Sequence, residues 1–287
     1  MSPMHSYKET VKDCLKLRKK GAKLETIGLS KHGNKIILVS LGNGDKRVLI
    51  VCRQHGNEPT STEAMLEYMK EIMAPPTEKH RLIKEKTKLF IIPIANPDGA
   101  KIFEQLCKNN KTSLLTSYAA RSNRLYRGDI NRDHKKRKTS EAQAIFNTIK
   151  RVQPHLILDL HNFFPAYRYT ILQKALYDFC PAFSTNAKIK PEIQKLCHKL
   201  CKTSIEAVRN AGGKPSKING LWTGIDGRML TVKEGVIETY YPLYHGIPAL
   251  TFETLGGFNL CSRGIERGKK LHKAAVHAVL ESFLQMS

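Results

Sequence analysis

The chain has 287 residues, 41% hydrophobic and 25% charged, a balance typical of a globular protein that buries a sizeable core. This length suits one large α/β domain or two small ones. No run approaches the ~18 consecutive apolar residues of a membrane-spanning helix, and the amino terminus lacks the apolar segment of a signal peptide. We therefore expect a cytoplasmic protein with no membrane partner.

The net charge of +23 is the unusual feature of the composition. A positive charge of this size favours anionic partners, because it attracts them over long distances. It is concentrated between Lys108 and Lys138, where ten basic residues accompany two acidic ones. Aromatic residues make up only 7% of the chain, and no recognisable nucleic-acid module occurs. We expect an acidic substrate rather than nucleic acid.

The seven cysteines are odd in number and show no disulfide framework, so they predict reduced thiols. Cys197, His198 and Cys201 would share one helical turn, but this stretch supplies too few ligands for a metal site. We interpret them as two cysteines on the face of a helix.

Helical and strand-like patterns alternate along the chain. In chain order they predict a helix at 6–20, strands at 35–41 and 47–53, a helix after residue 59, a strand at 88–96 ending in a turn at 96–99, a helix at 140–152, a strand at 155–162, a helix at 234–245, a strand at 249–254 and a helix at 263–285. Residues from about 163 to 230 show no clear pattern. The alternation predicts an α/β fold with a mixed, largely parallel sheet and helices on both faces.

Polar residues follow three of the predicted strands at their carboxyl ends. His55 follows the strand at 47–53, Asp159 and His161 end the strand at 155–162, and Glu253 ends the strand at 249–254. Loops at this edge of an α/β sheet commonly carry the chemistry. We therefore expect these residues to form one site.

Three of the residues near these strand ends suit a catalytic zinc, which takes three protein ligands and keeps one position open. His55 and Glu58 lie three residues apart on a loop that contains Gly56, and His161 follows 103 residues later. Two histidines and one glutamate are a known ligand set of zinc hydrolases. A His-x-x-Glu pattern alone is weak evidence, because many loops contain one.

The order of six segments resembles the zinc carboxypeptidase family. The segments are HGNEP (55–59), ANPDG (95–99), RGDINRD (127–133), SEAQAI (140–145), LDLHN (158–162) and GIPALTFET (246–254). The resemblance implies a single catalytic domain over residues 1–287 that binds one Zn²⁺. It also implies hydrolysis of a C-terminal peptide or amide bond through a metal-activated water.

By this resemblance, His55, Glu58 and His161 are the metal ligands and Glu253 is the general base. A carboxylate beside the metal can take a proton from the water and deliver it to the leaving amine. The residues around Glu253 independently favour a functional role, because an unpaired charge in the apolar run ALTFET would be costly to bury.

The resemblance assigns substrate binding to Asn131 and Arg132, since a guanidinium and an amide can grip a terminal carboxylate together. A second arginine is expected to polarise the scissile carbonyl and stabilise the oxyanion. Arg121 is our candidate for that role, Arg124 is a further substrate-binding candidate, and Arg127 remains an alternative.

Asp129 and Asp159 suit a supporting role, because each could accept the free N–H of a ligand histidine and so fix its tautomer. Asp129 matches the family position better. Asp159 lies two residues before His161, which places both side chains on one face of a strand.

The resemblance has two gaps. The family's gating tyrosine is missing from residues 222–232, and we interpret Tyr240, Tyr241 and Tyr244 as core or rim aromatics of a helix. The specificity pocket cannot be matched either, although Glu238 is a candidate to face it and select a basic group.

Two other functions stay open. The first is an amidohydrolase of N-acyl amino acids, which would resemble the aspartoacylase and succinylglutamate desuccinylase branch through HGNE, the Asn-Arg pair and DLHN. The second is a non-catalytic basic binding protein. The expected substrate is thus a peptide or an acylated amino acid with a free carboxylate.

Overall fold

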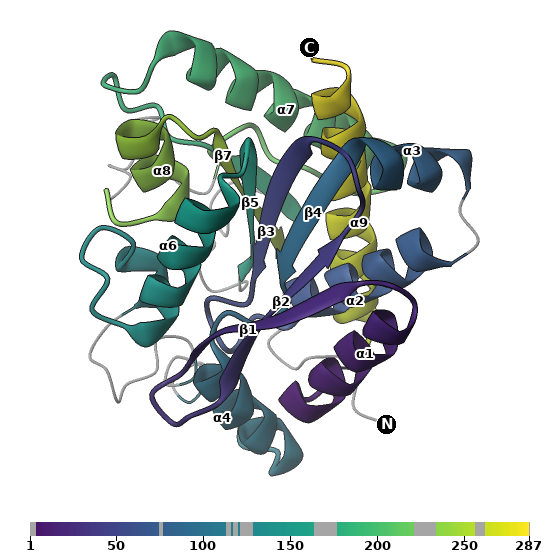
Figure 1. Cartoon of the computed structure of the whole chain (residues 1–287), viewed down its shortest axis with the longest axis vertical. Coiled ribbons are helices and arrows are strands. Elements are labelled where there is room, and N and C mark those ends of the chain that lie inside the picture. The colour runs from purple at the N-terminus through teal and green to yellow at the C-terminus, as the bar shows by residue number, and fades with distance from the viewer. Residues whose placement is uncertain are drawn as a thin grey trace.

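A seven-stranded mixed sheet lies between two layers of helices (Figure 1). The structure is a computed structural model that describes residues 4–74, 77–112, 116, 120, 129–163, 177–220, 234–255 and 262–286. Strands in these ranges are β1 (Lys23–Leu29), β2 (Lys35–Leu41), β3 (Lys46–Cys52), β4 (Thr87–Ile92), β5 (Leu156–Phe163), β6 (Phe179–Ala182) and β7 (Ala249–Leu255). The predicted α/β class is confirmed.

The sheet order is β1-β2-β4-β3-β5-β7-β6. The central strands β4, β3, β5 and β7 pair in parallel, whereas β1, β2 and β6 pair antiparallel toward the two edges. Strand β5 is buried along its whole length, as its nearly unbroken apolar run predicts. Because β3, β5 and β7 are neighbours, their carboxyl ends meet at one edge of the sheet.

Helices cover both faces (Figure 1). The larger core cluster packs β3, β5 and β7 against α1, α2, α7 and α9, and the smaller one packs the opposite face against α6 and α8. The helices are α1 (Tyr7–Lys19), α2 (Thr60–Met73), α3 (Glu78–Lys86), α4 (Pro97–Lys108), α6 (Ser140–Val152), α7 (Pro191–Asn210), α8 (Ile237–His245) and α9 (Ser262–Leu284), with a short 3₁₀ helix η2 (Ile130–Arg132). None of those in the described ranges combines the length and apolarity needed to span a bilayer.

The turn predicted at residues 96–99 was wrong, because these residues start α4. The Asn96 side chain accepts a hydrogen bond from the Gly99 N–H (2.8 Å), and Pro97 occupies the first helical turn. The first N–H groups of a helix have no helical partner. Asparagine before the helix accepts a hydrogen bond from one of them, and proline at the start has no N–H that needs a partner.

The region without a clear pattern contains β6 and α7. On α7, Cys197 and Cys201 are buried in the core, whereas His198 is exposed. The interpretation of two cysteines on a helix face is therefore confirmed.

Candidate metal centre and active site

The loop after β3 carries His55 and Glu58 to the carboxyl edge of the sheet. At its start, Arg53 adopts a left-handed backbone conformation (φ 55°), and its Nε–H donates to the Gly56 carbonyl (3.0 Å). Gly56 lies directly on α4, where an added Cβ would come within 2.1 Å of the Gly99 carbonyl carbon. Only glycine fits this close approach. The loop is therefore held by its own arginine and by the first turn of α4.

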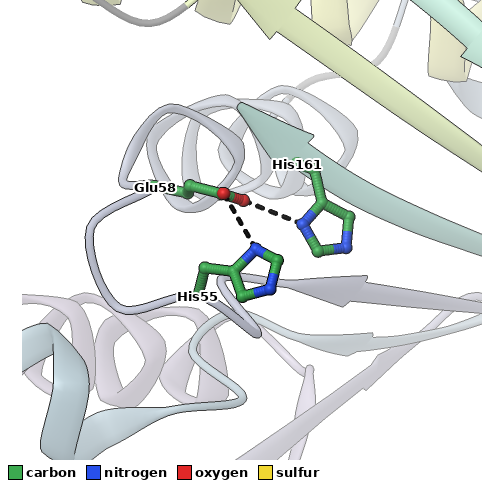
Figure 2. Close-up of side chains that lie close together, drawn as sticks. All are labelled: His55, Glu58 and His161. Carbon is green, nitrogen blue, oxygen red and sulfur yellow. Dashed lines mark hydrogen bonds and ion pairs between the residues drawn. The ribbon is translucent and has the colours of Figure 1, made fainter. Parts of the chain in front are cut away.

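His55, Glu58 and His161 converge at this edge (Figure 2). The Nδ1 atom of each histidine lies 2.8 Å from a different oxygen of Glu58. All three side chains are buried, and one ligand atom from each lies within 4.8 Å of the others. Two imidazole nitrogens and a carboxylate oxygen are donors that Zn²⁺ prefers, so these residues could hold the ion.

A second carboxylate lies on the far side of each imidazole. His55 Nε2 is 3.0 Å from Asp129, and His161 Nε2 is 3.0 Å from Asp159. When Nε2–H donates to a carboxylate, Nδ1 keeps its lone pair for a metal. Both aspartates thus occupy positions from which they can fix the tautomer that a metal site requires.

Buried charges at the cluster shift the pKa values of their neighbours. Burial raises the pKa of Glu58, but His55 and His161 outweigh burial and lower this pKa well below its usual range. Burial lowers the pKa of His161, but Asp159 and Glu58 outweigh it, and the pKa lies well above its usual value. A metal that binds His161 must therefore displace a proton, which makes binding depend on pH.

Strand β7 brings Glu253 beside the cluster. Glu253 pairs in register with His161 of β5, as Thr251 does with Asp159. Adjacent strands lie about 4.8 Å apart, and paired residues in a parallel sheet point to the same face. Glu253 is half-buried, so its carboxyl is not sealed off from solvent.

Asn131 and Arg132 follow directly after Asp129, in η2. The Asn131 N–H donates to Asp129 (3.0 Å), and Asn131 is buried whereas Arg132 is exposed. The pair therefore lies at the rim of the site, and Asp129 connects it to His55. The other predicted substrate residues Arg121, Arg124 and Arg127, and the segment 222–232, lie outside the described residues.

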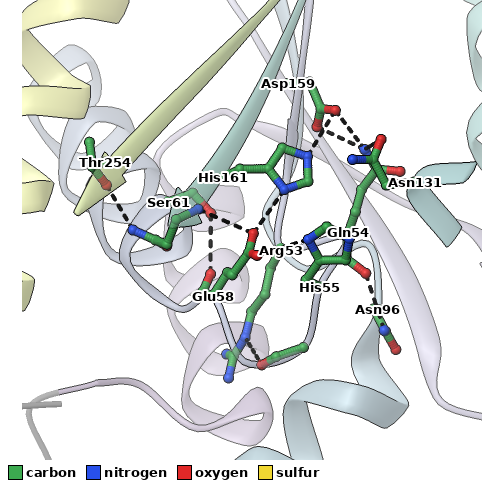
Figure 3. A network of polar contacts seen from close by, with 12 residues as sticks. Arg53, Gln54, His55, Glu58, Ser61, Asn96, Asn131, Asp159, His161 and Thr254 are labelled. Atoms are coloured by element: carbon green, nitrogen blue, oxygen red, sulfur yellow. Dashed lines mark hydrogen bonds and ion pairs between the residues drawn. The ribbon is translucent and has the colours of Figure 1, made fainter. Parts of the chain in front are cut away.

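Three residues near the cluster were missed in the sequence or only partly recognised. Gln54 donates to Asp159 (Figure 3), and His134 contacts Gln54 from the other side, so the three form a buried polar network. Glu238 at the start of α8 is also buried, and its Oε2 has no hydrogen-bond partner among the residues that the structure describes. Burial and nearby Asp159 raise the pKa of Glu238. The available signal was their position: Gln54 directly precedes His55, and His134 lies two residues after Arg132.

The three tyrosines of α8 lie where we expected. Tyr240 and Tyr241 are buried, and their rings pack edge to face with centroids 5.1 Å apart. Tyr244 is exposed. They are core and rim aromatics, as predicted.

A buried site of two histidines and one glutamate, at the carboxyl edge of a mixed α/β sheet, is a single-metal centre of the kind that zinc hydrolases use. A family model described as zinc carboxypeptidase matches residues 9–169, and the chain belongs to this family. The match includes His55, Glu58 and His161. It ends before Glu253, whose placement rests on the pairing of β5 with β7.

Curated relatives are similar to about half of the chain. Carboxypeptidase 2 of Trichophyton tonsurans is 28% identical over 148 residues, which cover 51% of this chain and 24% of the relative. Carboxypeptidase 2 of Trichophyton rubrum is 28% identical over 166 residues, covering 56% of this chain and 28% of the relative. The chain thus spans only about a quarter of the length of these relatives.

Solved carboxypeptidase structures share the fold of almost the whole chain. The metallo-carboxypeptidase from Burkholderia cenocepacia has a TM-score of 0.73 at 17% identity, covering 99% of this chain and 70% of that chain. The carboxypeptidase A from Helicoverpa armigera has a TM-score of 0.73 at 15% identity, covering 99% of this chain and 74% of that chain. These likenesses establish the fold.

Proposed function

We propose that the protein is a zinc-dependent metallocarboxypeptidase that hydrolyses the C-terminal peptide or amide bond of a substrate with a free carboxylate. The observation that carries the proposal is the cluster of His55, Glu58 and His161, with Glu253 in register on the neighbouring strand. This arrangement puts a metal site and a carboxylate on one face of the sheet. The two are the minimum that metal-assisted amide hydrolysis needs.

Each side chain has a definite task in this proposal. Zn²⁺ bound to the cluster would supply a Lewis acid and lower the pKa of a water to about 7. Glu253 accepts the proton of that water and returns it to the nitrogen of the leaving group. Asn131 and Arg132 at the rim bind the terminal carboxylate through charge-assisted hydrogen bonds. Arg121, or its neighbour Arg124, stabilises the oxyanion.

We also propose a single catalytic domain over residues 1–287 and a cytoplasmic location. All the described strands belong to one sheet, which supports one domain. The six cysteines of the described ranges are free thiols, and five of them are buried. Unpaired thiols in such number are typical of proteins from reducing compartments.

The first experiment measures zinc and substrate choice together. Protein purified without added metal should contain about one zinc per chain, and a chelator should abolish hydrolysis of a peptide until zinc is restored. Blocking the substrate carboxylate as an amide should slow cleavage by ~30-fold or more, because a charge-assisted contact is worth about 2–5 kcal/mol. Equal rates on free and amidated peptides would instead indicate an endopeptidase, and cleavage of N-acyl amino acids alone would indicate the amidohydrolase.

The second experiment tests Glu253. Glu253→Gln removes the proton acceptor but keeps the shape, so kcat should fall by ~10³-fold or more while the zinc content is unchanged. The control is Glu206→Gln, since Glu206 is an exposed residue of α7. Glu253 would not be the base if its variant kept nearly the activity of the control.

A further inference from the structure

Behind His161, hydrogen bonds link the metal centre to Asp159 and Gln54 (Figure 3). Asp159 accepts from His161 Nε2 (3.0 Å) and from the Gln54 side-chain amide, which lies 2.8 Å from both of its oxygens. His134 Nε2 is 2.8 Å from Gln54 Oε1, and its Nδ1 is 3.5 Å from the Tyr241 hydroxyl. All five side chains are fully buried, each with 0% exposure.

The chemistry of these groups determines which atom donates and which accepts in each of these hydrogen bonds. Burial lowers the pKa of His134 to about 4, so at neutral pH its ring carries a single proton. The carbonyl oxygen of Gln54 can only accept, so the proton of His134 must lie on Nε2. Gln54 then has to turn its NH₂ group toward Asp159. The Tyr241 hydroxyl completes the chain by donating toward Nδ1 of His134.

We propose that Gln54 and His134 are positioning residues of the metal centre, which set its zinc affinity by holding Asp159 and, through it, His161. His134 fixes which end of the Gln54 amide faces Asp159. Gln54 in turn fixes the Asp159 carboxylate, which accepts a hydrogen bond from His161 Nε2–H. This bond orients the imidazole so that Nδ1 points at the metal position. The inference rests on the zinc centre of the proposed function and extends it to two residues outside the ligand set. Gln54 also donates to Asn131 Oδ1 (3.5 Å), so it borders the substrate-binding pair as well.

A purely structural role is the competing explanation. A buried amide and a buried imidazole must be hydrogen-bonded wherever they occur, so satisfied contacts alone do not prove a task. The two explanations differ in what they require of His134. Packing needs only a ring-sized polar group, whereas positioning needs a donor at the place of Nε2. Metal-ligand supports of this kind typically change affinity by about 10- to 100-fold when removed.

The test compares two amides at one position. In His134→Gln, the side-chain nitrogen can take the place of Nε2 and still donate to Gln54. In His134→Asn, the shorter side chain places its amide where Nδ1 was and leaves Gln54 without a donor. We expect the zinc dissociation constant, measured by competition with a chromophoric chelator, to rise by about 10-fold in His134→Asn and by less than about 3-fold in His134→Gln.

Two further variants complete the design. Gln54→Leu removes the donor to Asp159 itself and should weaken zinc by about 10- to 100-fold. Thr148→Val is the control, because it removes a buried hydroxyl on α6 that bonds to the Ala144 carbonyl (2.8 Å). It should lower the melting temperature without changing zinc affinity. The visible spectrum of the cobalt-substituted protein should change in His134→Asn and not in Thr148→Val.

Equal zinc affinities of His134→Asn, His134→Gln and wild type would overturn the inference and leave His134 a packing residue. The measurement needs no substrate, so it separates this inference from the peptidase proposal. If no peptide is cleaved but the affinities rank as expected, the positioning role stands and the proposed activity fails. A wild-type protein that binds no zinc would overturn both.

Discussion

Ionisable side chains are buried together at one place in this protein. His55, Glu58, Asp159 and His161 are each at most 2% exposed, although burying a charge costs several kcal/mol unless it is paired. The structure pairs each of them with at least one opposite or hydrogen-bonding neighbour. A fold that needed only stability would fill this space with apolar side chains. The concentration of charge is therefore best explained by the metal centre.

Glu238 differs from these residues because one of its oxygens has no hydrogen-bond partner in the described part of the chain. It is 4% exposed, and within the described ranges its Oε2 accepts no hydrogen bond. Burial, and then the negative charge of Asp159, raise the pKa of Glu238 above its usual value. Its protonated form is thus favoured in the folded protein, and ionisation above that raised pKa opposes folding.

We predict that Glu238→Gln stabilises the protein at high pH only. When the pKa of a carboxyl is higher in the folded than in the unfolded state, the protonated group stabilises the fold at pH values below the unfolded pKa. This stabilisation is lost as the pH rises through the folded-state pKa. Glutamine does not titrate, so the variant should be more stable than wild type near pH 8 and about as stable near pH 4. Thermal unfolding across this range measures the difference.

The control for this experiment is again Glu206→Gln, on the exposed face of α7. Its stability should follow that of wild type at every pH. A Glu238→Gln variant that is less stable than wild type at pH 8 would show that the ionised carboxylate has a stabilising partner instead.

The loop between β3 and α2 owes its shape to α4, which follows it in the chain. The Arg53 carbonyl accepts from the Asn96 N–H (3.1 Å), and the Gln54 carbonyl accepts from the Asn96 side chain (3.2 Å). Asn96 also caps α4. One residue therefore joins the start of that helix to the loop that presents His55. Gly56 then rests on Gly99 with no room for a side chain.

We predict that Gly56→Ala weakens zinc binding by about 10-fold or more, because the added methyl group would have to push the loop away from backbone that cannot yield. Isothermal titration with zinc measures this loss. Gly212→Ala is the matched control, since Gly212 has φ +81° and open space around it. It should lower stability by about 1 kcal/mol through backbone strain and leave zinc affinity unchanged. Equal zinc affinities in the two variants would contradict the role given to Gly56.

The molecule as a whole carries a net charge of +23, which is concentrated in the basic segment from Lys108 to Lys138. Arg132 lies at the rim of the site, next to Asn131. Some other members are committed to local contacts: Arg137 stacks on Phe146 (4.3 Å to the ring centre), and Lys135 pairs with Glu234. Electrostatic attraction of a substrate would therefore come from the rim and from the net charge rather than from the whole segment.

We predict a preference for glutamate-rich over neutral peptides that share one C-terminal residue. The preference should appear in kcat/KM more than in kcat, because attraction over distance raises the rate of encounter. It should shrink between about 50 and 500 mM salt, since the screening length is already only about 8 Å at physiological ionic strength. A preference that is absent at low salt, or unchanged at high salt, would show that the net charge plays no part in substrate selection.

The sequence alone was enough to predict those strands and helices in which apolar residues recur at the spacing of one buried face. The strand at 35–41 and the helix at 140–152 have the predicted bounds, because each turns one apolar face to the core along its own length. Strand β1 was not predicted, because all of its residues are partly buried or exposed and, among the described strands, it is an edge strand that pairs with β2. The order of the site residues along the chain also carried the family resemblance, since ligand types and strand ends are local features.

Only the tertiary structure decided which elements meet. Periodicity shows that a face is buried but not against which partner, so the insertion of β4 between β2 and β3 could not be read from the chain. For the same reason, the contact of Gln54 with His134, 80 residues further on, was invisible in the sequence. The ligand residues could be named from the chain, whereas the side chains that hold them in place became visible only once distant segments were packed together.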